Sequence, residues 1–507
     1  MRNIKEWAIL GFAILMIGCG GEDNSAGAES RSLIFAPISV DDSNNREEYD
    51  IIRENIFKDV STSPLSTFSA DVDTASYSNV RRYLMVNEKL PPKDAVRIEE
   101  MLNYFNYNYS EPNSSKPFLM NKRVGQTVWN DKTKIIHIGL QTKKVDFSQL
   151  PASNLVFLID VSGSMSSNNK LPLLKESIKL LVEKLREKDR VSIVVYSGSS
   201  GLVLDKARGD EKKKIIDSLN RLTAGGATAG GEGIELAYKV ALESFIEDGN
   251  NRVILATDGD FNVGKSSQRE LEELIEEKKE SGVYLTVLGF GMGNLKDDKI
   301  ETLADKGNGN YAYIDTLLEA KKVLVTEMGS TLYTVAKDVK IQVRFNPLNV
   351  NQYRLIGYEN RRLENEEFAD DNKDAGEVGM GHSVTVLYEI KPNTSNQNGG
   401  SSRYQDVTYN EEFKDELATI SIRYKELNSS SSIEINSTIK VDDEQIDKQD
   451  FTFAQTVAGF GMILRDSKFK ENLTIDKLIN LVKTAKGEDK EGYRAEFIEM
   501  MKKANTL

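Results

Sequence analysis

Short apolar runs alternate with longer amphipathic stretches through the middle of the chain. The apolar runs span residues 156–159, 191–196, 253–256, 284–289 and 311–314. Between them lie stretches whose apolar residues recur every three or four positions, at 173–185, 215–222, 234–245 and 270–279. The first pattern predicts buried strands, and the second predicts helices that pack through one face. Because strands that alternate with helices of this length pair in parallel, we predict an α/β fold with a doubly wound parallel sheet over residues 149–332.

The pattern changes after residue 335. Runs with strand character, separated by polar segments, cover residues 339–345, 383–390, 418–424 and 433–441, and helical patterns follow at 453–464, 475–485 and 493–503. We therefore expect residues 333–507 to form a mainly antiparallel β region that ends in helices. Residues 56–148 are expected to form a smaller N-terminal region, with helical patterns that include Leu84 and residues 96–105.

The first 19 residues have the composition of an export signal. Arg2 and Lys5 precede an apolar segment, residues 7–17, which is too short to span a bilayer. It ends at Leu15-Met16-Ile17-Gly18-Cys19, which resembles the lipobox of bacterial lipoproteins and contains the only cysteine of the chain. That resemblance implies cleavage before Cys19 and a lipid on this residue. A short membrane anchor with an incidental cysteine is the alternative.

Residues 20–55 are rich in Gly, Ser, Asn and acidic side chains, and they have few large apolar residues. This composition is typical of a flexible, solvated tether, which here would hold the folded part of the protein off a membrane. A lipid on Cys19 places the protein in the bacterial cell envelope. Gly20 stands where many lipoproteins retained at the inner membrane have Asp, so we expect the outer membrane.

Charge and residue usage argue against two broad functions. The chain has 79 acidic against 66 basic residues, whereas nucleic-acid binding leaves a basic footprint. Its two histidines, His137 and His382, lie in different segments without metal-ligand spacing, and no serine lies in a Gly-x-Ser-x-Gly elbow. We therefore expect a protein that is not an enzyme.

One loop carries the residue types of a metal site. The apolar residues 155–159 lead into Asp160-Val161-Ser162-Gly163-Ser164, so one carboxylate and two hydroxyls follow a buried strand. Hard divalent cations bind oxygen donors of this kind. Ligands of open α/β sheets lie at the carboxyl ends of the strands, which is where this loop is expected.

Two further loops are expected at the same edge of the sheet. The glycine-rich segment 224–233 contains Thr228 at the entrance of a predicted helix, and the apolar run from Val253 ends at Asp258. Together the three loops offer two carboxylates and three hydroxyls. This oxygen-only set predicts Mg²⁺, with Mn²⁺ or Ca²⁺ as alternatives, rather than zinc. Thr223, five residues before Thr228, is a second candidate for the hydroxyl.

Asp160-x-Ser162-x-Ser164, Thr228 and Asp258 together resemble the metal-ion-dependent adhesion site of von Willebrand factor type A domains, which have a Rossmann-like fold. The resemblance implies that Ser162, Ser164 and Thr228 coordinate the ion directly, while Asp160 and Asp258 act largely through water. It also implies that an acidic side chain of a partner protein completes the coordination. A cation with few direct anionic ligands remains electrophilic, which favours the incoming carboxylate.

The regions on either side carry resemblances of their own. Residues 68–77, 96–105, 355–361, 374–377 and 460–465 are similar to the N-terminal and C-terminal regions of a bacterial family of von Willebrand A lipoproteins. The sequence therefore predicts a lipid-anchored envelope protein that binds another protein through a divalent metal.

Other interpretations remain open at this stage. The metal could be purely structural in a scaffold protein, and the wider domain family includes adaptors of AAA⁺ ATPases, which an exported protein would not meet. Residues 259–266 match the Gly-x4-Gly-Lys-Ser pattern of a phosphate-binding loop, in which Lys265 would bind phosphate and the protein would be an NTPase. Against this interpretation, Asp258 and Asp260 place negative charge where a triphosphate would lie. Asp71-x-Asp73 resembles half of a calcium loop, although the Gly and Glu of an EF-hand are missing.

Overall fold

The computed structural model describes residues 49–70, 73–112, 116–144, 147–226, 230–259, 268–292, 297–327, 329, 333–393, 411–427 and 429–507. Within these ranges, no helix has both the length and the hydropathy needed to cross a membrane. The predicted signal segment and tether lie outside the described residues, apart from the last part of the tether.

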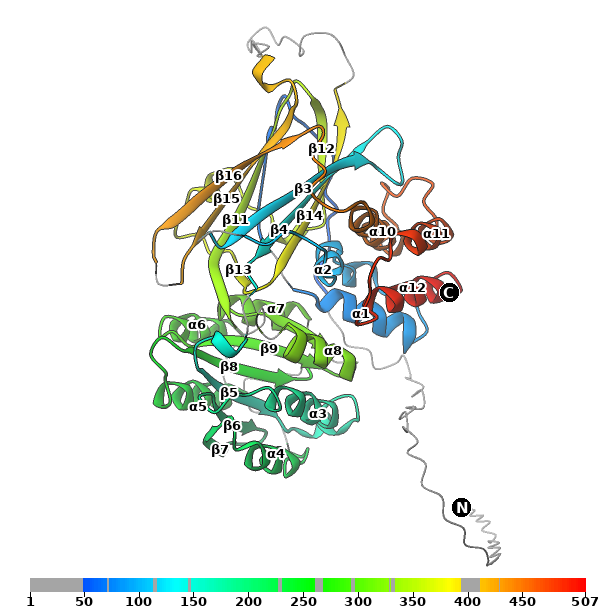
Figure 1. Cartoon of the computed structure of the whole chain (residues 1–507). Helices are drawn as coiled ribbons and strands as arrows, with labels where there is room; N and C mark the ends of the chain where they lie inside the picture. The colour runs from blue at the N-terminus through cyan, green and yellow to red at the C-terminus, as the bar shows by residue number, and fades with distance from the viewer. Residues whose placement is uncertain are drawn as a thin grey trace, which may run out of the picture. The chain divides into compact units, whose positions relative to one another are not determined.

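A six-stranded sheet forms the centre of the predicted α/β region (Figure 1). Its strands, in order across the sheet, are β10 (Tyr311–Ile314), β9 (Tyr284–Phe290), β8 (Asn250–Thr257), β5 (Ser153–Asp160), β6 (Arg190–Tyr196) and β7 (Ser200–Arg208). The strands from β10 to β6 run parallel, which confirms the α/β prediction. Each predicted apolar run is one of these strands.

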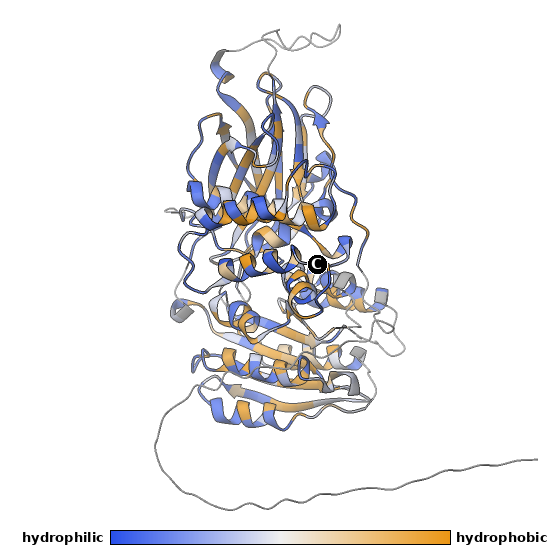
Figure 2. Ribbon diagram, turned by 90° about the vertical axis from the view of Figure 1, so that its right-hand side faces the viewer, coloured by the Kyte–Doolittle hydropathy of each residue, from blue (hydrophilic) through white to orange (hydrophobic). Residues whose placement is uncertain are grey.

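Both faces of this sheet are covered by helices. One face packs against α3 (Leu171–Val182), α4 (Lys212–Asn220) and α8 (Leu317–Lys321), and the other packs against α5 (Gly230–Glu243), α6 (Gln268–Lys279) and α7 (Asp297–Lys306). Within β5, Phe157 enters the first core, and Val156 and Leu158 enter the second. Because the central strands are buried on both faces, they read as continuous apolar runs. Figure 2 shows these apolar residues concentrated along the strands.

The edge strand β7 was not predicted from the sequence. It follows β6 after the short turn at residues 197–199 and pairs with β6 in the antiparallel direction. Most of its residues are exposed or half-buried, so it lacks the continuous apolar run that identifies the other strands. The sheet is therefore parallel except at this edge.

Two antiparallel sheets form a sandwich. The first contains β1 (Lys58–Asp59), β12 (Val350–Ile356), β14 (Ser383–Pro392), β4 (Lys134–Thr142) and β3 (Phe118–Gln126). The second contains β13 (Gly376–Gly379), β11 (Thr334–Phe345), β15 (Glu416–Lys425) and β16 (Ser432–Lys440), with β2 (Leu65–Ser69) also paired to β11. Apolar side chains from both sheets meet in one core. The antiparallel C-terminal strands are thus confirmed, but β1 to β4 come from the N-terminal region, so the two flanking regions share their sheets.

A helical layer covers the outer face of the first sheet. It contains α1 (Ala75–Met85), α2 (Ile98–Asn103), α10 (Lys448–Leu464), α11 (Ile475–Ala485) and α12 (Tyr493–Ala504). Its aromatic centre joins N-terminal and C-terminal segments, because the ring centroid of Phe105 lies 4.8 Å from that of Phe453 and 5.4 Å from that of Phe497. The three predicted C-terminal helices are α10, α11 and α12.

Arg81 of α1 connects three parts of the chain. Its guanidinium is 3% exposed and donates to Asp315, which follows β10, through Nε at 2.8 Å and also through Nη2. It donates further to Glu319 of α8 at 2.8 Å and to Glu496 of α12 at 2.9 Å. Tyr104, after α2, accepts from Arg81 Nη1 at 3.0 Å and donates to Glu319 at 2.9 Å. The cluster therefore ties the α/β region to helices from both flanking regions.

A second arginine, which is 11% exposed, makes a similar connection. Arg361, which follows β12, pairs with Glu301 and Asp305 of α7 at 2.7 Å each and with Asp73 at 3.1 Å. Asp73 also accepts the backbone N–H of Tyr311 in β10 at 3.1 Å. Asp73, half of the calcium-loop candidate, is thus engaged in a link between segments, and Asp71 lies outside the described residues.

Replacing Arg81 by Met should destabilise the protein strongly. Asp315 and Glu319 are 4% and 1% exposed, and the substitution removes the guanidinium that pairs with both of them. Loss of one partner from a buried ion cluster costs about 3–5 kcal/mol. Denaturant unfolding measures the change. Arg208→Met is the matched control, because Arg208 is 57% exposed in its pairs with Glu187 and Asp210 and should change stability by less than about 1 kcal/mol. Equal effects of the two substitutions would contradict the role of Arg81.

Candidate metal centre

The loops that carry Asp160 and Asp258 leave neighbouring parallel strands at the same edge of the sheet. Asp160 is the last residue of β5, and Asp258 directly follows β8. The register aligns Ile159 with Ala256, so both carboxylates lie about level at the carboxyl ends of the strands. Both residues are fully buried. The structure thus brings together two of the predicted site residues whose separation in the sequence is almost a hundred positions.

The Asp160 carboxylate is held by the start of its own loop and by β6. Oδ1 accepts the backbone N–H of Ser162 at 2.8 Å, and Oδ2 accepts the hydroxyl of Tyr196 at 3.1 Å. Burial raises the pKa of Asp160 to about 6; Asp258 acts in the same direction, and the hydrogen bonds from Ser162 oppose the shift. The site thus holds a carboxylate whose negative charge is only partly compensated by protein groups.

The two predicted serine ligands lie side by side. Their Oγ atoms are 3.0 Å apart, with Ser162 buried and Ser164 exposed to solvent. Residues Gly163–Ser166 form a single 3₁₀ turn, which brings both hydroxyls to the same side of the loop. The hydroxyls therefore form a small donor pair with one side open to solvent.

The glycine-rich segment is attached to this loop through its backbone. Gly163 donates its N–H to Gly226 O at 3.0 Å, and Gly225 donates to Val161 O at 2.8 Å. Gly226 has φ +88°, and a Cβ there would lie 2.6 Å from Ser197 Oγ, so only glycine fits this turn without strain. Thr228 lies two residues further on, outside the described residues, and its role remains a prediction. Thr223, the alternative, is exposed.

A lysine that the sequence analysis did not identify pairs with the other carboxylate, that of Asp258. Lys170, at the start of α3, donates from Nζ to Asp258 Oδ2 at 2.8 Å. Its stem passes over Gly291, where a Cβ would lie 2.3 Å from Lys170 Cε. The glycine that directly follows β9 therefore leaves the room through which the ammonium reaches Asp258. No local pattern indicates this contact, because it joins residues 88 positions apart.

The residues present fit a divalent cation. Two carboxylates and two hydroxyls supply oxygen donors only, as Mg²⁺ or Mn²⁺ prefers. With Lys170 on Asp258, one of the two negative charges is compensated internally. The Asp160 carboxylate and the serine pair remain as the part of the set that a cation would complete.

The competing sequence candidates are placed elsewhere. Of the phosphate-loop pattern at 259–266 only Gly259 is described, and Lys265 and Cys19 also lie outside the described residues. His137 is fully buried, with Nε2 2.7 Å from the hydroxyl of Tyr109. Burial lowers the pKa of His137 to about 3 and that of His382 to about 4. The neutral rings of the buried His137 and the half-buried His382 are consistent with a structural role.

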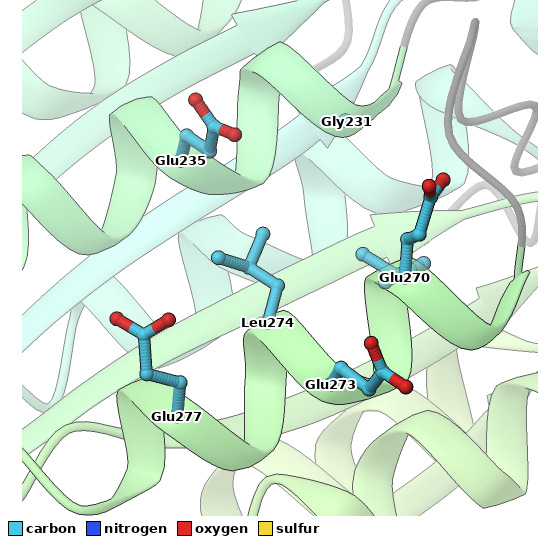
Figure 3. Close-up of a pocket in the computed structure, with 7 residues that line it drawn as sticks. Gly231, Glu235, Glu270, Glu273, Leu274 and Glu277 are labelled. Carbon is cyan, nitrogen blue, oxygen red and sulfur yellow. The ribbon is translucent and has the colours of Figure 1, made fainter.

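An acidic groove runs between α5 and α6 (Figure 3). Glu235 of α5 and Glu270, Glu273 and Glu277 of α6 line it, with Leu274 at its floor. In a parallel α/β sheet the helices begin at the carboxyl edge of the strands. Gly231 and Glu270, near the beginnings of α5 and α6, therefore mark the end of the groove that is nearer to the loops of the metal centre.

Comparison with known families agrees with this geometry. Residues 154–326 match the von Willebrand factor type A domain family, and residues 43–137 match a family described as von Willebrand factor. Residues 330–507 match the C-terminal family of the uncharacterized protein YfbK. Each of the three main regions of the chain is thus matched.

Individual proteins show how far the similarity extends. The uncharacterized protein YfbK of Escherichia coli (strain K12) is 43% identical over 471 residues, which cover 90% of this chain and 81% of that protein. The uncharacterized protein sll0103 of Synechocystis sp. is 29% identical over 186 residues, or 36% of this chain and 43% of that protein. A solved von Willebrand factor type A structure from Catenulispora acidiphila is 14% identical, with a TM-score of 0.41 over 78% of this chain and 91% of that one.

Von Willebrand A domains generally mediate protein–protein interactions, often with a divalent metal, and are generally not enzymes. The similarity to YfbK extends through both regions that flank the α/β domain. The chain therefore belongs to the bacterial YfbK family of von Willebrand factor type A domain proteins, with a family-specific C-terminal region.

Proposed function

We propose that this protein binds a partner protein through a divalent metal ion, Mg²⁺ or its analogues Mn²⁺ and Ca²⁺, at a metal-ion-dependent adhesion site. Asp160, Ser162, Ser164, Thr228 and Asp258 are the residues that would hold the ion. The observation that carries the proposal is the convergence of two buried carboxylates and a pair of adjacent hydroxyls at one edge of the sheet. When bound, the ion supplies a positive centre for an acidic side chain of the partner.

The exposure of Ser164 favours a binding role over a purely structural metal. Ser164 is open to solvent, so an ion beside it has a side that a partner can approach. Hydroxyl ligands are neutral and leave the ion electrophilic, whereas a structural cage would surround it with carboxylates. The acidic groove between α5 and α6 further favours a partner that carries basic residues beside its acidic ligand.

The proposal includes anchorage in the bacterial cell envelope, in the outer membrane, through a lipid on Cys19. The support is the position of the only cysteine, directly after Leu15-Met16-Ile17-Gly18 and a basic, then apolar, segment. A tether after the lipid would let the adhesion site reach a partner away from the membrane surface.

Asp160→Asn should abolish saturable Mg²⁺ binding, because the amide keeps the shape of the side chain but removes the charge nearest to the serine pair. Isothermal titration of Mg²⁺ and Mn²⁺ measures the change. Thr228→Ala should weaken binding at least tenfold, and Thr223→Ala is its matched control and should bind as the unmodified protein does. Normal binding by Asp160→Asn would refute the site.

The same variants separate adhesion from a structural metal. For adhesion, capture of an envelope protein should require Mg²⁺, stop with EDTA and be absent with Asp160→Asn. For a structural metal, Mg²⁺ would raise the unfolding temperature, but capture of the envelope protein would not depend on the ion.

Lys170→Met should increase the affinity for Mg²⁺ by about tenfold or more, which corresponds to roughly 1.4 kcal/mol. The ammonium on Asp258 opposes a second cation at the same carboxylates, and its removal leaves Asp258 with a charge to be compensated. Thermal stabilisation by Mg²⁺ should increase as well. Lys179→Met, on the outer part of the same helix, should leave both quantities unchanged. An unchanged affinity in Lys170→Met would show that the lysine does not influence the ion.

Cys19→Ser should prevent lipid attachment. Labelling cells with radioactive palmitate should mark the unmodified protein, and the variant should carry no label, because the chain has no other cysteine. The label should cofractionate with outer-membrane markers. Label on the variant, or a label-free unmodified protein in the soluble fraction, would contradict the anchor.

A further inference from the structure

Three carboxylates outside the adhesion site gather where the α/β domain meets the sandwich. Asp338, Asp374 and Glu377 each offer one oxygen, and these oxygens all lie within 4.8 Å of one another. Asp338 belongs to β11, Asp374 precedes β13, and Glu377 lies in β13. None of them belongs to the loops that carry the predicted adhesion site.

Irregular pairing in β11 directs Asp338 into this cluster. The register of β11 shifts between Ala336 and Val339, and Asp338 adopts φ +51°, a conformation that Asp tolerates better than most residues. Its Oδ1 accepts the backbone N–H of Ala375 at 3.2 Å. This contact holds the segment before β13, and with it Asp374, beside the bulge.

Two of the three carboxylates have cationic partners. Lys425 Nζ lies 2.7 Å from Asp338 Oδ2, and Lys279 Nζ, at the end of α6, lies 3.4 Å from Asp374 Oδ2. Because Lys279 belongs to the α/β domain, the cluster lies at the contact between that domain and the sandwich.

Glu377 is the exception. Its side chain is 7% exposed, and within the described part of the chain no hydrogen bond or ion pair reaches its carboxylate. Arg252 of β8 is buried on the same side, but its Nη1 donates to Thr286 and it forms no ion pair with Glu377. A carboxylate that is buried without a partner is costly, and it is aimed at the two other acidic groups.

Burial raises the pKa of Glu377 well above its usual range, and Asp374, Asp305 and Asp338 act in the same direction. Either a proton or a bound cation therefore compensates this group. Three carboxylate oxygens form a hard donor set for a divalent cation. Ca²⁺ accepts irregular coordination by carboxylates, whereas Mg²⁺ requires nearly ideal octahedral geometry, so carboxylates placed by an irregular strand suit Ca²⁺ better.

We propose that Asp338, Asp374 and Glu377 bind a Ca²⁺ ion at the junction of the α/β domain and the sandwich. Asp374 is half-exposed and leaves a side on which water completes the coordination. The ion compensates Glu377 and joins β11 and β13 beside α6. This site is independent of the adhesion site and does not rest on the proposed function.

Titration of Ca²⁺ alone into the full chain carrying Asp160→Asn tests the site. We expect one saturable site and a rise in the unfolding temperature with Ca²⁺. Adding Glu377→Gln should weaken Ca²⁺ binding at least tenfold and remove the rise. Glu366→Gln is the matched control, because Glu366 is an exposed glutamate of the same region, and it should leave both unchanged.

Folding is checked by circular dichroism and by the unfolding temperature in EDTA. Glu377→Gln removes a buried charge, so its unfolding temperature in EDTA should equal or exceed that of the parent chain. A folded Glu377→Gln chain that binds Ca²⁺ as well as its parent would overturn the proposal. Absence of Ca²⁺ binding in the Asp160→Asn chain would overturn it as well and would leave a proton on Glu377.

Discussion

The arrangement of this protein depends on a buried guanidinium. Arg81 is surrounded by Asp315 and Glu319 of the α/β domain, by Glu496 of α12 and by the hydroxyl of Tyr104. Removing an arginine and its carboxylates from water is costly, and only a complete set of partners compensates that cost. The planar guanidinium directs its N–H donors at several acceptors in a fixed geometry, whereas the ammonium of lysine is a point charge on a flexible stem. The cluster therefore forms only when segments from the N-terminal, central and C-terminal regions are together.

The topology of the sandwich explains why ion pairs between the regions are needed. The strand β4 lies between β3 and β14, so its partners come from both sides of the α/β domain in the sequence. The α/β domain is thus inserted between two halves of one sandwich. Arg361 adds a second link, because it joins the segment after β12 to α7 and to Asp73. Ion pairs between regions fix an insertion that short connections alone would leave free to move.

The candidate metal centre differs from the ion-pair clusters of Arg81 and Arg361 in how its charge is compensated. At Arg81 several acidic groups pair with one cation. At the edge of the sheet Asp258 pairs with Lys170, whereas within the described residues Asp160 has hydrogen-bond donors and no ion pair. Charge that is left over at a solvent-accessible edge is what a binding site for a cation requires. A related imbalance of charge occurs at Glu377, at the domain junction, where burial and neighbouring acidic groups together raise the pKa of the carboxyl group.

The sequence by itself determined the α/β domain and the polar residues that follow its central strands. The apolar runs that end at Asp160 and Asp258 identified strands buried on both faces, because their pattern depends only on local burial. The sequence also identified Ser162 and Ser164 and the C-terminal helices, because a motif within one loop and the periodicity of a single helix are local patterns. Only the tertiary structure decided that β4 pairs with β14, that Lys170 reaches Asp258, and that Arg81 meets Glu496. These contacts join residues from 88 to 415 positions apart, and no periodicity in a single sequence encodes which distant charge or strand will be the partner.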